Sequence, residues 1–452
     1  MIGNNALLFV SALACTGAFA LSDNTTSQVP KKTGSGYVLT DIVGKRADAH
    51  PNPRIYQYPQ FLPDVVDTLL GDNILGNILL KERSDPAPVP VSNKFSYYEI
   101  DIEVGTPGQQ LSLILDTGSS DLWGVSTSDI RCSNNGQGSL DCSQNTFNQE
   151  KSSTWQVNSS APNFGIQYVD GSGAKGVWGN DVVSFGDVSL DSCSFGLATD
   201  SNSSTGIMGI AFPGQESTPY PYPNVPQLLK DQGYIETVAY SLWLNDVQAS
   251  TGNILFGAVD HGKYDGPLYT IPIINTGSGS EPWDMAVTFS NITVCLGGVF
   301  STIEFTEGTV ILDSGTTFSY LPSNMVQPIL KGLNAQYNSD ISGYTVPCDV
   351  DDGGFIEFNL DGAIVVVLIQ EFLLHLKTAS GDIAYQNGKP LCQVGLVEQD
   401  DANSIHILGD TFLRSAYVVY DLQNYEISMA NSALNSSFSD IEVIGSGGVR
   451  AL

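Results

Sequence analysis

A seven-residue segment occurs twice in the chain, and this repeat constrains the fold more than any other feature. Residues 114–120 (ILDTGSS) recur 197 residues later as residues 311–317 (ILDSGTT). A second matched pair follows in the same order, residues 206–212 (GIMGIAF) and 406–412 (HILGDTF). The glycine at the fourth position of each segment, residue 209 or 409, lies 93 or 96 residues after the aspartate of its own copy. Two motifs in one order at nearly equal intervals predict two homologous lobes.

The segments between these motifs predict an all-β protein. Residues 97–104 and 111–115 are rich in β-branched, aromatic and leucine residues and end at turn-forming residues, as strands do. Only residues 225–232 and 323–333 predict short helices, while residues 363–369 predict a buried strand that leads into a short helix. The 46 glycines and the low charged content of 15% agree with many strands and turns.

The first twenty residues have the features of a secretory signal peptide. Residues 6–20 are mostly apolar and small, and they end in Ala-Phe-Ala, a cleavage pattern. The alternative is a buried apolar segment. No later apolar run is long enough to cross a bilayer.

Residues 21–83 differ from the rest of the chain in charge. They contain seven basic and seven acidic residues, so the whole net charge of −30 lies after residue 83. This pattern predicts a propeptide that neutralises the acidic body until it is removed, with residues 45–46 (KR) and 81–83 (KER) as processing candidates ahead of the proline-rich tether at 86–90. The alternative is a disordered linker without a function. We expect an N-terminal lobe over residues 84–267, a C-terminal lobe over 268–433 and a polar tail over 434–452.

The charge also excludes classes of partner. A net charge of −30 repels phosphates, which argues against nucleic acid and against an anionic membrane surface. A strongly acidic surface suits low pH, where carboxylates become protonated and self-repulsion falls. Residues 436–452 lack the hydrophobic tail of a lipid-anchor signal. We therefore expect no stable membrane anchor and a secreted, extracellular protein, with a vacuolar location as the alternative.

The cysteines and the glycosylation sequons agree with secretion. One of the seven cysteines leaves with the signal peptide, and the remaining six predict three disulfides. We expect the pairs Cys132–Cys142 and Cys348–Cys392, with Cys193–Cys295 as the remainder. The cysteine spacings do not fit a zinc site, and no metal is expected. Five sequons predict a glycoprotein: Asn24, Asn158, Asn202, Asn291 and Asn435.

The repeated aspartates carry the chemistry. Asp116 and Asp313 each follow an apolar pair, which predicts a buried strand, and each precedes a hydroxyl residue and a glycine, which allow a tight turn. One such aspartate alone would be an ordinary turn-capping residue. Two at equivalent positions of twin lobes would meet, share one proton and activate a water molecule between them. The supporting residues would be Thr117, Gly118, Ser119, Ser314, Gly315 and Thr316.

Other catalytic patterns fit less well. The chain has neither a G-x-S-x-G nucleophile motif nor an H-E-x-x-H metal motif, and its four histidines favour structural roles. Residues 171–176 match G-x-G-x-x-G, but a strand follows them where a dinucleotide site needs a helix. No cofactor is expected.

From about residue 95 to 431 the chain resembles the pepsin family, and more narrowly its secreted fungal members, the candidapepsins and yapsins. The segments that carry the resemblance are residues 104–107 (VGTP), 116–123 (DTGSSDLW), 313–317 (DSGTT) and 407–414 (ILGDTFLR). The resemblance implies a bilobal fold of two homologous β-barrel-like lobes with a cleft between them. It also implies an aspartic endopeptidase that acts on polypeptides at acidic pH, is made as a zymogen inhibited by its own propeptide, and is a monomer.

The resemblance also implies a mobile hairpin, the flap, that closes over the substrate. Tyr168 would cover the scissile bond with Trp123 packed beside it, and the flap would continue through Asp170, Gly171 and Ser172. The alternative for both aromatic residues is ordinary core packing. The family usually has glycine after the flap tyrosine, and Val169 stands there instead. Asp170 could pair with a basic substrate residue, or it could only shape the turn.

Two other function classes stay open at this point. A non-catalytic binding protein could share the fold, although loss of an aspartate or of the flap would then be expected. A glycosidase also uses two carboxylates, but the twin turns do not resemble such a site.

Overall fold

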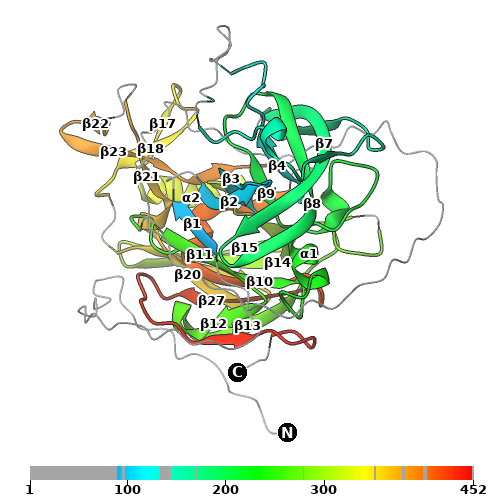
Figure 1. Cartoon of the computed structure of the whole chain (residues 1–452). Coiled ribbons are helices and arrows are strands. Elements are labelled where there is room, and N and C mark those ends of the chain that lie inside the picture. The colour runs from blue at the N-terminus through cyan, green and yellow to red at the C-terminus, as the bar shows by residue number, and fades with distance from the viewer. Residues whose placement is uncertain are drawn as a thin grey trace, which may run out of the picture.

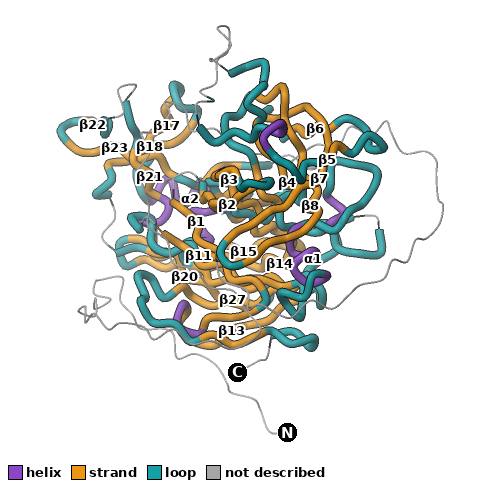
Figure 2. Tube along the Cα trace, viewed as in Figure 1, coloured by secondary structure: helices purple, strands orange, loops and turns teal. Residues whose placement is uncertain are grey.

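The computed structural model describes residues 89–93, 97–132, 142, 144–168, 171–249, 251–277, 279–350, 353–378, 382–400 and 405–449. The expected signal peptide, the expected propeptide with its processing sites, and the sequon at Asn24 lie outside these residues, as do Val169 and Asp170. Strands dominate the described residues and helices are few and short, as Figure 2 shows. Both predicted short helices are confirmed, and so is a strand at residues 363–368 with a short helix after it. Only alternate residues of this strand are buried, and Ile364 is exposed, so the strand is buried on one face and not throughout.

The elements are these, in chain order. The first part of the chain contains β1 (Val89–Asn93), β2 (Tyr98–Val104), β3 (Gln109–Asp116), β4 (Leu122–Val125), η2 (Gln149–Lys151), β5 (Gln156–Val157), β6 (Phe164–Gln167), β7 (Gly173–Phe185), β8 (Val188–Ser201), β9 (Ile207–Gly209), η3 (Pro213–Gln215), α1 (Val225–Asp231), β10 (Ala239–Trp243), β11 (Thr251–Phe256), β12 (Ala258–Asp260), η4 (His261–Lys263) and β13 (Tyr264–Pro272). The second part contains β14 (Ala286–Leu296), β15 (Val299–Leu312), β16 (Ser319–Leu321), α2 (Ser323–Gly332), β17 (Gln336–Asn338), β18 (Gly343–Pro347), β19 (Phe355–Leu360), β20 (Ala363–Leu368), η5 (Ile369–Phe372), β21 (Leu373–His375), β22 (Tyr385–Gln386), β23 (Lys389–Val394), β24 (Leu396–Glu398), β25 (His406–Leu408), α3 (Asp410–Leu413), β26 (Ala416–Asp421), β27 (Glu426–Ser432) and β28 (Ile441–Val443).

The two lobes repeat one strand order. In the N-terminal lobe the order is β3-β9-β4-β8, and in the C-terminal lobe it is β15-β25-β16-β24. In both lobes, the first and second strands of this order pair in parallel, the second and third pair antiparallel, and the third and fourth pair in parallel. The repeat in the sequence is therefore a repeat in topology, and it places the two aspartates at equivalent strand ends.

The sheets build the lobes and join them. In the N-terminal lobe an additional pairing of β2 with β7 closes a ring of six strands, β2-β3-β9-β4-β8-β7. The C-terminal lobe has a seven-stranded and a five-stranded sheet. Between them, β10 of the first lobe pairs with β26 of the second, so that one sheet crosses the lobe boundary (Figure 1). The predicted boundary after residue 267 falls inside β13, a strand of this shared sheet.

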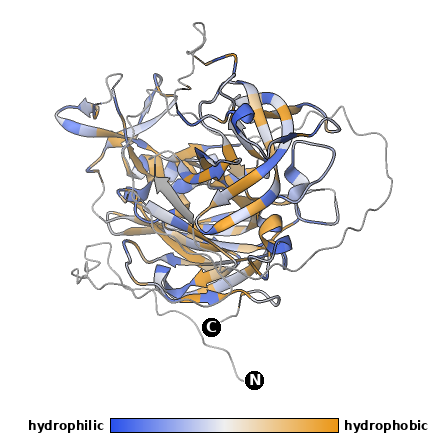
Figure 3. Cartoon of the chain, in the orientation of Figure 1, coloured by the Kyte–Doolittle hydropathy of each residue, from blue (hydrophilic) through white to orange (hydrophobic). Residues whose placement is uncertain are grey.

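One large hydrophobic core runs through both lobes. It extends from Tyr98 in β2 to Met429 in β27. Alternation along the strands produces it, since β2 and β19 bury every second residue. Figure 3 shows apolar residues concentrated on the strands in the middle of the molecule. None of the helices among the described residues has the length and apolar character needed to cross a membrane.

The C-terminal tail carries regular structure. Within residues 434–449, β28 pairs antiparallel with β12, and the red end of the chain runs beside β12 and β13 in Figure 1. Polar groups of this segment hydrogen-bond to the first lobe, as those of Ser436, Ser439 and Asp440 do. The predicted polar tail therefore carries ordered structure, and residues 434–449 are called the C-terminal strap below.

Candidate active site

The two aspartates lie at matched turns. Asp116 ends β3, and Asp313 follows directly after β15. In the first turn the backbone N–H of Gly118 donates to Asp116 Oδ1 at 2.7 Å and Ser119 Oγ donates to Asp116 Oδ2 at 2.5 Å. The second turn repeats this pattern.

In that second turn the backbone N–H of Gly315 donates to Asp313 Oδ1 at 2.9 Å, and Thr316 Oγ1 donates to Asp313 Oδ2 at 2.5 Å. The hydroxyl and glycine positions of the repeated motif thus have the same role in both copies. Each turn supplies hydrogen-bond donors that fix the orientation of its carboxyl group.

The glycines let the two turns touch. A Cβ added to Gly118 would lie 2.5 Å from Asp313 Oδ1, and one added to Gly315 would collide in the same way with the Asp116 carboxyl group. Each carboxyl group therefore lies over the glycine of the opposite turn. Both aspartates are buried, so the structure brings together the two residues that the sequence singled out.

A second set of bonds locks the turns across the lobe boundary. Thr117 Oγ1 donates to the backbone oxygen of Leu312, and Ser314 Oγ donates to that of Leu115, both at 2.9 Å. Each hydroxyl also accepts the backbone N–H of the other residue. The distance between the two carboxyl groups is consequently set by four reciprocal hydrogen bonds.

The surroundings of the two carboxyl groups shift their pKa values by different amounts. Burial raises the pKa of both, and the charge of Asp116 raises the pKa of Asp313 further, to well above its ordinary value. Donation from Ser119 and the Gly118 backbone opposes the rise for Asp116. Two buried carboxyl groups in contact favour the sharing of one proton, and the direction of the shifts favours Asp313 as its carrier.

The hairpin expected to be the flap lies beside this pair. Tyr168 follows β6, and its hydroxyl accepts the indole N–H of Trp123 at 2.9 Å. Burial raises the pKa of the Tyr168 phenol well above its ordinary value, and the neighbouring Asp116 charge raises it further. Gly171 and Ser172 complete the described part of the hairpin, where the Tyr168 N–H donates to the Ser172 oxygen at 2.8 Å.

The second repeated motif is explained by close packing behind the turns. A Cβ on Gly209 would lie 2.6 Å from the Ser120 nitrogen, and one on Gly409 would collide with the backbone oxygens of Thr316 and Phe318. Each glycine thus allows a neighbouring strand to approach the back of the turn that carries the aspartate.

Sequence reasoning missed two groups of buried charges near the site. In the C-terminal lobe, Arg414 Nε pairs with Glu371 at 2.7 Å, and both side chains are almost fully buried. Asp410 in α3 is buried too, and burial raises its pKa well above the ordinary value. An ILGD segment predicts a strand end but not that its aspartate is enclosed.

In the N-terminal lobe, Asp121 accepts the Tyr222 hydroxyl at 2.6 Å and the Ser217 N–H at 2.8 Å. Glu216 accepts the Tyr222 N–H at 2.9 Å, and burial raises its pKa to about 8. The Tyr222 ring packs against Trp178 in β7. No local pattern predicts that residues 121 and 216 meet.

Two of the three predicted disulfides are present, and the prediction of the third is wrong. Cys132–Cys142 and Cys348–Cys392 are bonded. Cys193 is a free, buried cysteine, so the predicted Cys193–Cys295 bond is wrong. The reason is spatial: Cys193 lies in β8 of the first lobe, whereas Cys295 lies in β14 of the second.

Among the described residues one group of three potential metal ligands lies close together: Cys348, His375 and Cys392. Two of these are joined in a disulfide, so they offer no thiolate to an ion.

Comparisons with known proteins agree with this geometry. Residues 97–432 match the family described as eukaryotic aspartyl protease. The chain belongs to this family. Aspartic proteinase 3 of Saccharomyces cerevisiae is 35% identical over 81% of this chain and 75% of its own length. Aspartic proteinase yapsin-3 of the same yeast is 37% identical over 83% of this chain and 73% of its own length.

A protein of Aspergillus fumigatus is similar to this chain as well. The probable aspartic-type endopeptidase opsB of Aspergillus fumigatus is 35% identical over 85% of this chain and 78% of its own length. The crystal structure of an aspartic proteinase from Irpex lacteus superposes with a TM-score of 0.62 at 21% identity, covering 78% of this chain and 99% of that one, and supports the bilobal fold. This aspartyl protease is therefore an aspartic-type endopeptidase that hydrolyses peptide bonds in polypeptides.

Proposed function

We propose that Asp116 and Asp313 are the catalytic residues of this endopeptidase and that they act through a water molecule. The observation that carries the proposal is the reciprocal contact of the two turns, in which each carboxyl group lies over the glycine of the other. Two buried carboxyl groups in contact cannot both ionise easily, so one proton is shared. No covalent intermediate is needed.

The hydrogen bonds favour one division of roles. Asp116, with donors from Ser119 and Gly118, is the ionised partner and accepts a proton from the attacking water. Asp313 is the protonated partner and polarises the substrate carbonyl oxygen. The proton that Asp116 accepts then passes to the leaving amine as the carbon–nitrogen bond breaks.

The hairpin at Tyr168 would close over the substrate. Its contact with Trp123 and its proximity to Asp116 support this role. Asp170 extends the proposal to specificity: a carboxylate at the flap would favour lysine or arginine before the cleaved bond. Cleavage of matched Lys and Phe peptides by wild type and Asp170→Ala tests it. Equal loss on both peptides would remove the specificity role.

We further propose a secreted zymogen, extracellular or vacuolar, whose propeptide is removed near residues 81–83. Support comes from β1, which lies between β11 and β2 in the shared sheet, so a cut beyond residue 89 would remove a strand. N-terminal sequencing of the active form would test the boundary. The sequons at Asn158, Asn291 and Asn435 stay predictions of glycosylation, and Asn158 and Asn435 are exposed.

The decisive experiment is proteolysis of denatured casein between about pH 2 and 7, with and without pepstatin, beside Asp116→Asn and Asp313→Asn. We expect acid-optimal cleavage that the inhibitor and either variant abolish. Retained cleavage in either variant would refute the assignment of the pair. No cleavage by acid-treated wild type would favour a non-catalytic protein with this fold.

A further inference from the structure

One asparagine joins the end of β8 to the far limb of the flap. Asn202 Oδ1 accepts the backbone N–H of Gly173 at 2.7 Å, and Asn202 Nδ2 donates to the backbone oxygen of Gly171 at 2.9 Å. The backbone N–H of Asn202 also donates to the Gly173 oxygen at 3.2 Å. Three hydrogen bonds thus hold a stretch of three flap residues to one residue outside the flap.

This stretch determines where Tyr168 lies. The Gly171 N–H donates to the Tyr168 oxygen at 3.0 Å, and the Tyr168 N–H donates to the Ser172 oxygen. Gly171 has a φ of +80°, a backbone conformation that glycine adopts readily. A shift of residues 171–173 would therefore move the Tyr168 hydroxyl relative to Trp123 and the aspartates.

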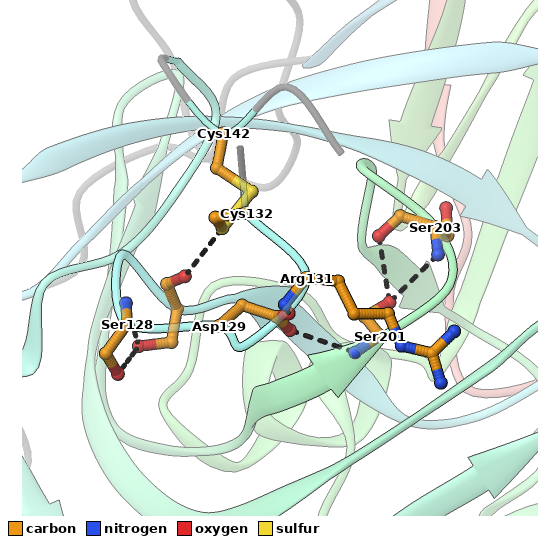
Figure 4. The surroundings of a disulfide bond; sticks show 8 residues. Ser128, Asp129, Arg131, Cys132, Cys142, Ser201 and Ser203 are labelled. Carbon is orange, nitrogen blue, oxygen red and sulfur yellow. Dashed lines mark hydrogen bonds between the residues drawn. A yellow bond between two sulfur atoms is a disulfide. The ribbon is translucent and has the colours of Figure 1, made fainter. Parts of the chain in front are cut away.

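The residues behind Asn202 are themselves fixed. Asp129 is fully buried and accepts two backbone N–H groups, from Ser201 at 2.9 Å and from Arg131 at 2.8 Å. Arg131 also pairs with Asp200 at 2.6 Å. Figure 4 shows Asp129, Arg131 and Ser201 in the surroundings of the Cys132–Cys142 disulfide.

Asn202 is also the first residue of a glycosylation sequon, completed by Ser204. Both polar atoms of the Asn202 side-chain amide bond to the flap, Oδ1 to Gly173 and Nδ2 to Gly171. An N-linked sugar is attached to Nδ2, the atom that donates to Gly171, and replaces one of its two hydrogens. Glycosylation would therefore compete with the flap for this nitrogen atom and for the space beside it.

We propose that Asn202 is a positioning residue for the flap and that the active enzyme carries no glycan on it. The inference rests on the proposed function of the Tyr168 hairpin. Asn202 would then be a positioning residue and not a site of glycosylation. Its amide would hold residues 171–173 where Tyr168 faces the catalytic pair.

The test compares Asn202→Ala, Asn202→Asp and the control Ser204→Ala, which removes the sequon and keeps the amide. Each full-length zymogen is activated in acid and assayed with a fluorogenic peptide across about pH 3 to 6. We expect Asn202→Ala to lower kcat/KM about 10- to 100-fold, since small misplacements near reacting atoms have effects of that size. Ser204→Ala should match wild type.

Asn202→Asp supplies a readout that a purely structural role would not move. A protonated carboxyl group can donate to the Gly171 oxygen, whereas the ionised form cannot. Its kcat/KM should approach that of wild type near pH 3 and fall to that of Asn202→Ala as the carboxyl group ionises, near its ordinary pKa of about 4. Mass spectrometry of the peptide containing Asn202 should show no glycan.

Wild-type kcat/KM in both Asn202 variants at every pH, or a fully glycosylated Asn202 in active enzyme, would overturn the inference alone. A wild-type protein that cleaves nothing would overturn the proposed function and this inference with it.

Discussion

Thr117 and Ser314 hold each other across the lobe boundary, and each is both donor and acceptor. The Thr117 N–H donates to Ser314 Oγ at 3.1 Å, and the Ser314 N–H donates to Thr117 Oγ1 at 2.9 Å. Their hydroxyls then donate to backbone oxygens of the opposite lobe. The two residues lie 197 positions apart in the chain, yet they act as one unit that sets the spacing of the aspartates.

Replacement of Ser314 by alanine tests this unit. The Leu115 oxygen and the Thr117 N–H would both lose a buried partner, at a cost of about 1–3 kcal/mol each. We expect lower stability in urea and a lower kcat, because the aspartates are no longer held in register. Ser314→Thr retains the hydroxyl and should keep most activity. An alanine variant as stable as wild type would contradict the role.

The close approach of Gly118 to the Asp313 carboxyl group leads to a second prediction. Gly118→Ala would place a Cβ 2.5 Å from Asp313 Oδ1, and the carboxyl group would have to move. We expect kcat to fall at least about 100-fold, because catalysis depends on sub-ångström placement of the pair. The circular dichroism spectrum should stay native. Gly445→Ala, where an added Cβ meets nothing within 4 Å, is the control. Full activity of Gly118→Ala would show that the turns do not touch in solution.

Glu216 predicts a pH dependence of stability. Burial raises its pKa from 4.5 to about 8, so the folded state binds a proton that the unfolded state releases. Its contribution is fully present below about pH 4.5 and is lost as the pH rises towards 8. Glu216→Gln should therefore unfold at higher urea concentration than wild type at pH 7.5, with a gain on the order of 1 kcal/mol after solvent screening.

The control for this prediction is the same comparison at pH 4, where wild-type Glu216 is already protonated and the two proteins should differ little. An equal difference between wild type and variant at both pH values would refute the assignment. Burial raises the pKa of Asp121, beside Glu216, in the same direction, so Asp121 should also stabilise the fold more at acidic pH than at neutral pH.

The C-terminal strap predicts a stabilising role outside the site. Asp260 accepts the Asp440 N–H at 2.7 Å and the Ser439 hydroxyl at 2.8 Å, while Lys263 Nζ donates to the Ser436 oxygen at 2.8 Å. Ile444 is 2% exposed. Deletion of residues 434–452 should cost about 3 kcal/mol from lost burial and hydrogen bonds, measured by urea unfolding, and leave kcat/KM unchanged at low temperature. Unchanged stability would mean that the strap does not dock in solution.

The parts of this structure that the sequence predicts are those encoded in consecutive residues. Asp116 and Asp313 were found because an apolar strand end, a hydroxyl and a glycine stand together in each copy, and repetition of the pattern implied that the copies meet. Residues 225–232 and 323–333 likewise predict the helices α1 and α2 from their own segments. These features depend on local geometry, which a short segment determines.

The features that were missed depend on contacts between distant segments. Asn202 has the local pattern of a surface sequon, and only the folded chain turns its amide towards Gly171. Glu216 lies 95 residues from Asp121, and no spacing rule predicts their burial together. The strap at residues 434–449 has a polar composition because its backbone and side chains bond to another segment, which is indistinguishable from solvation in the sequence.

The even number of cysteines was the only reason to expect a disulfide at Cys193. Its free thiol leads to a final prediction. Its side chain is 1% exposed in the core of the first lobe, and burial raises the pKa of its thiol to about 12. Thiolate is the reactive form, so Cys193 should resist iodoacetamide in the native enzyme and react only after unfolding in non-reducing denaturant. Peptide mapping would locate the label. The control is Cys193→Ala, which has no thiol at this position and should give no labelled peptide here even after unfolding. A Cys193–Cys295 peptide in the non-reduced map would restore the pairing inferred from the count and would require the two lobes to pack differently from the structure described above.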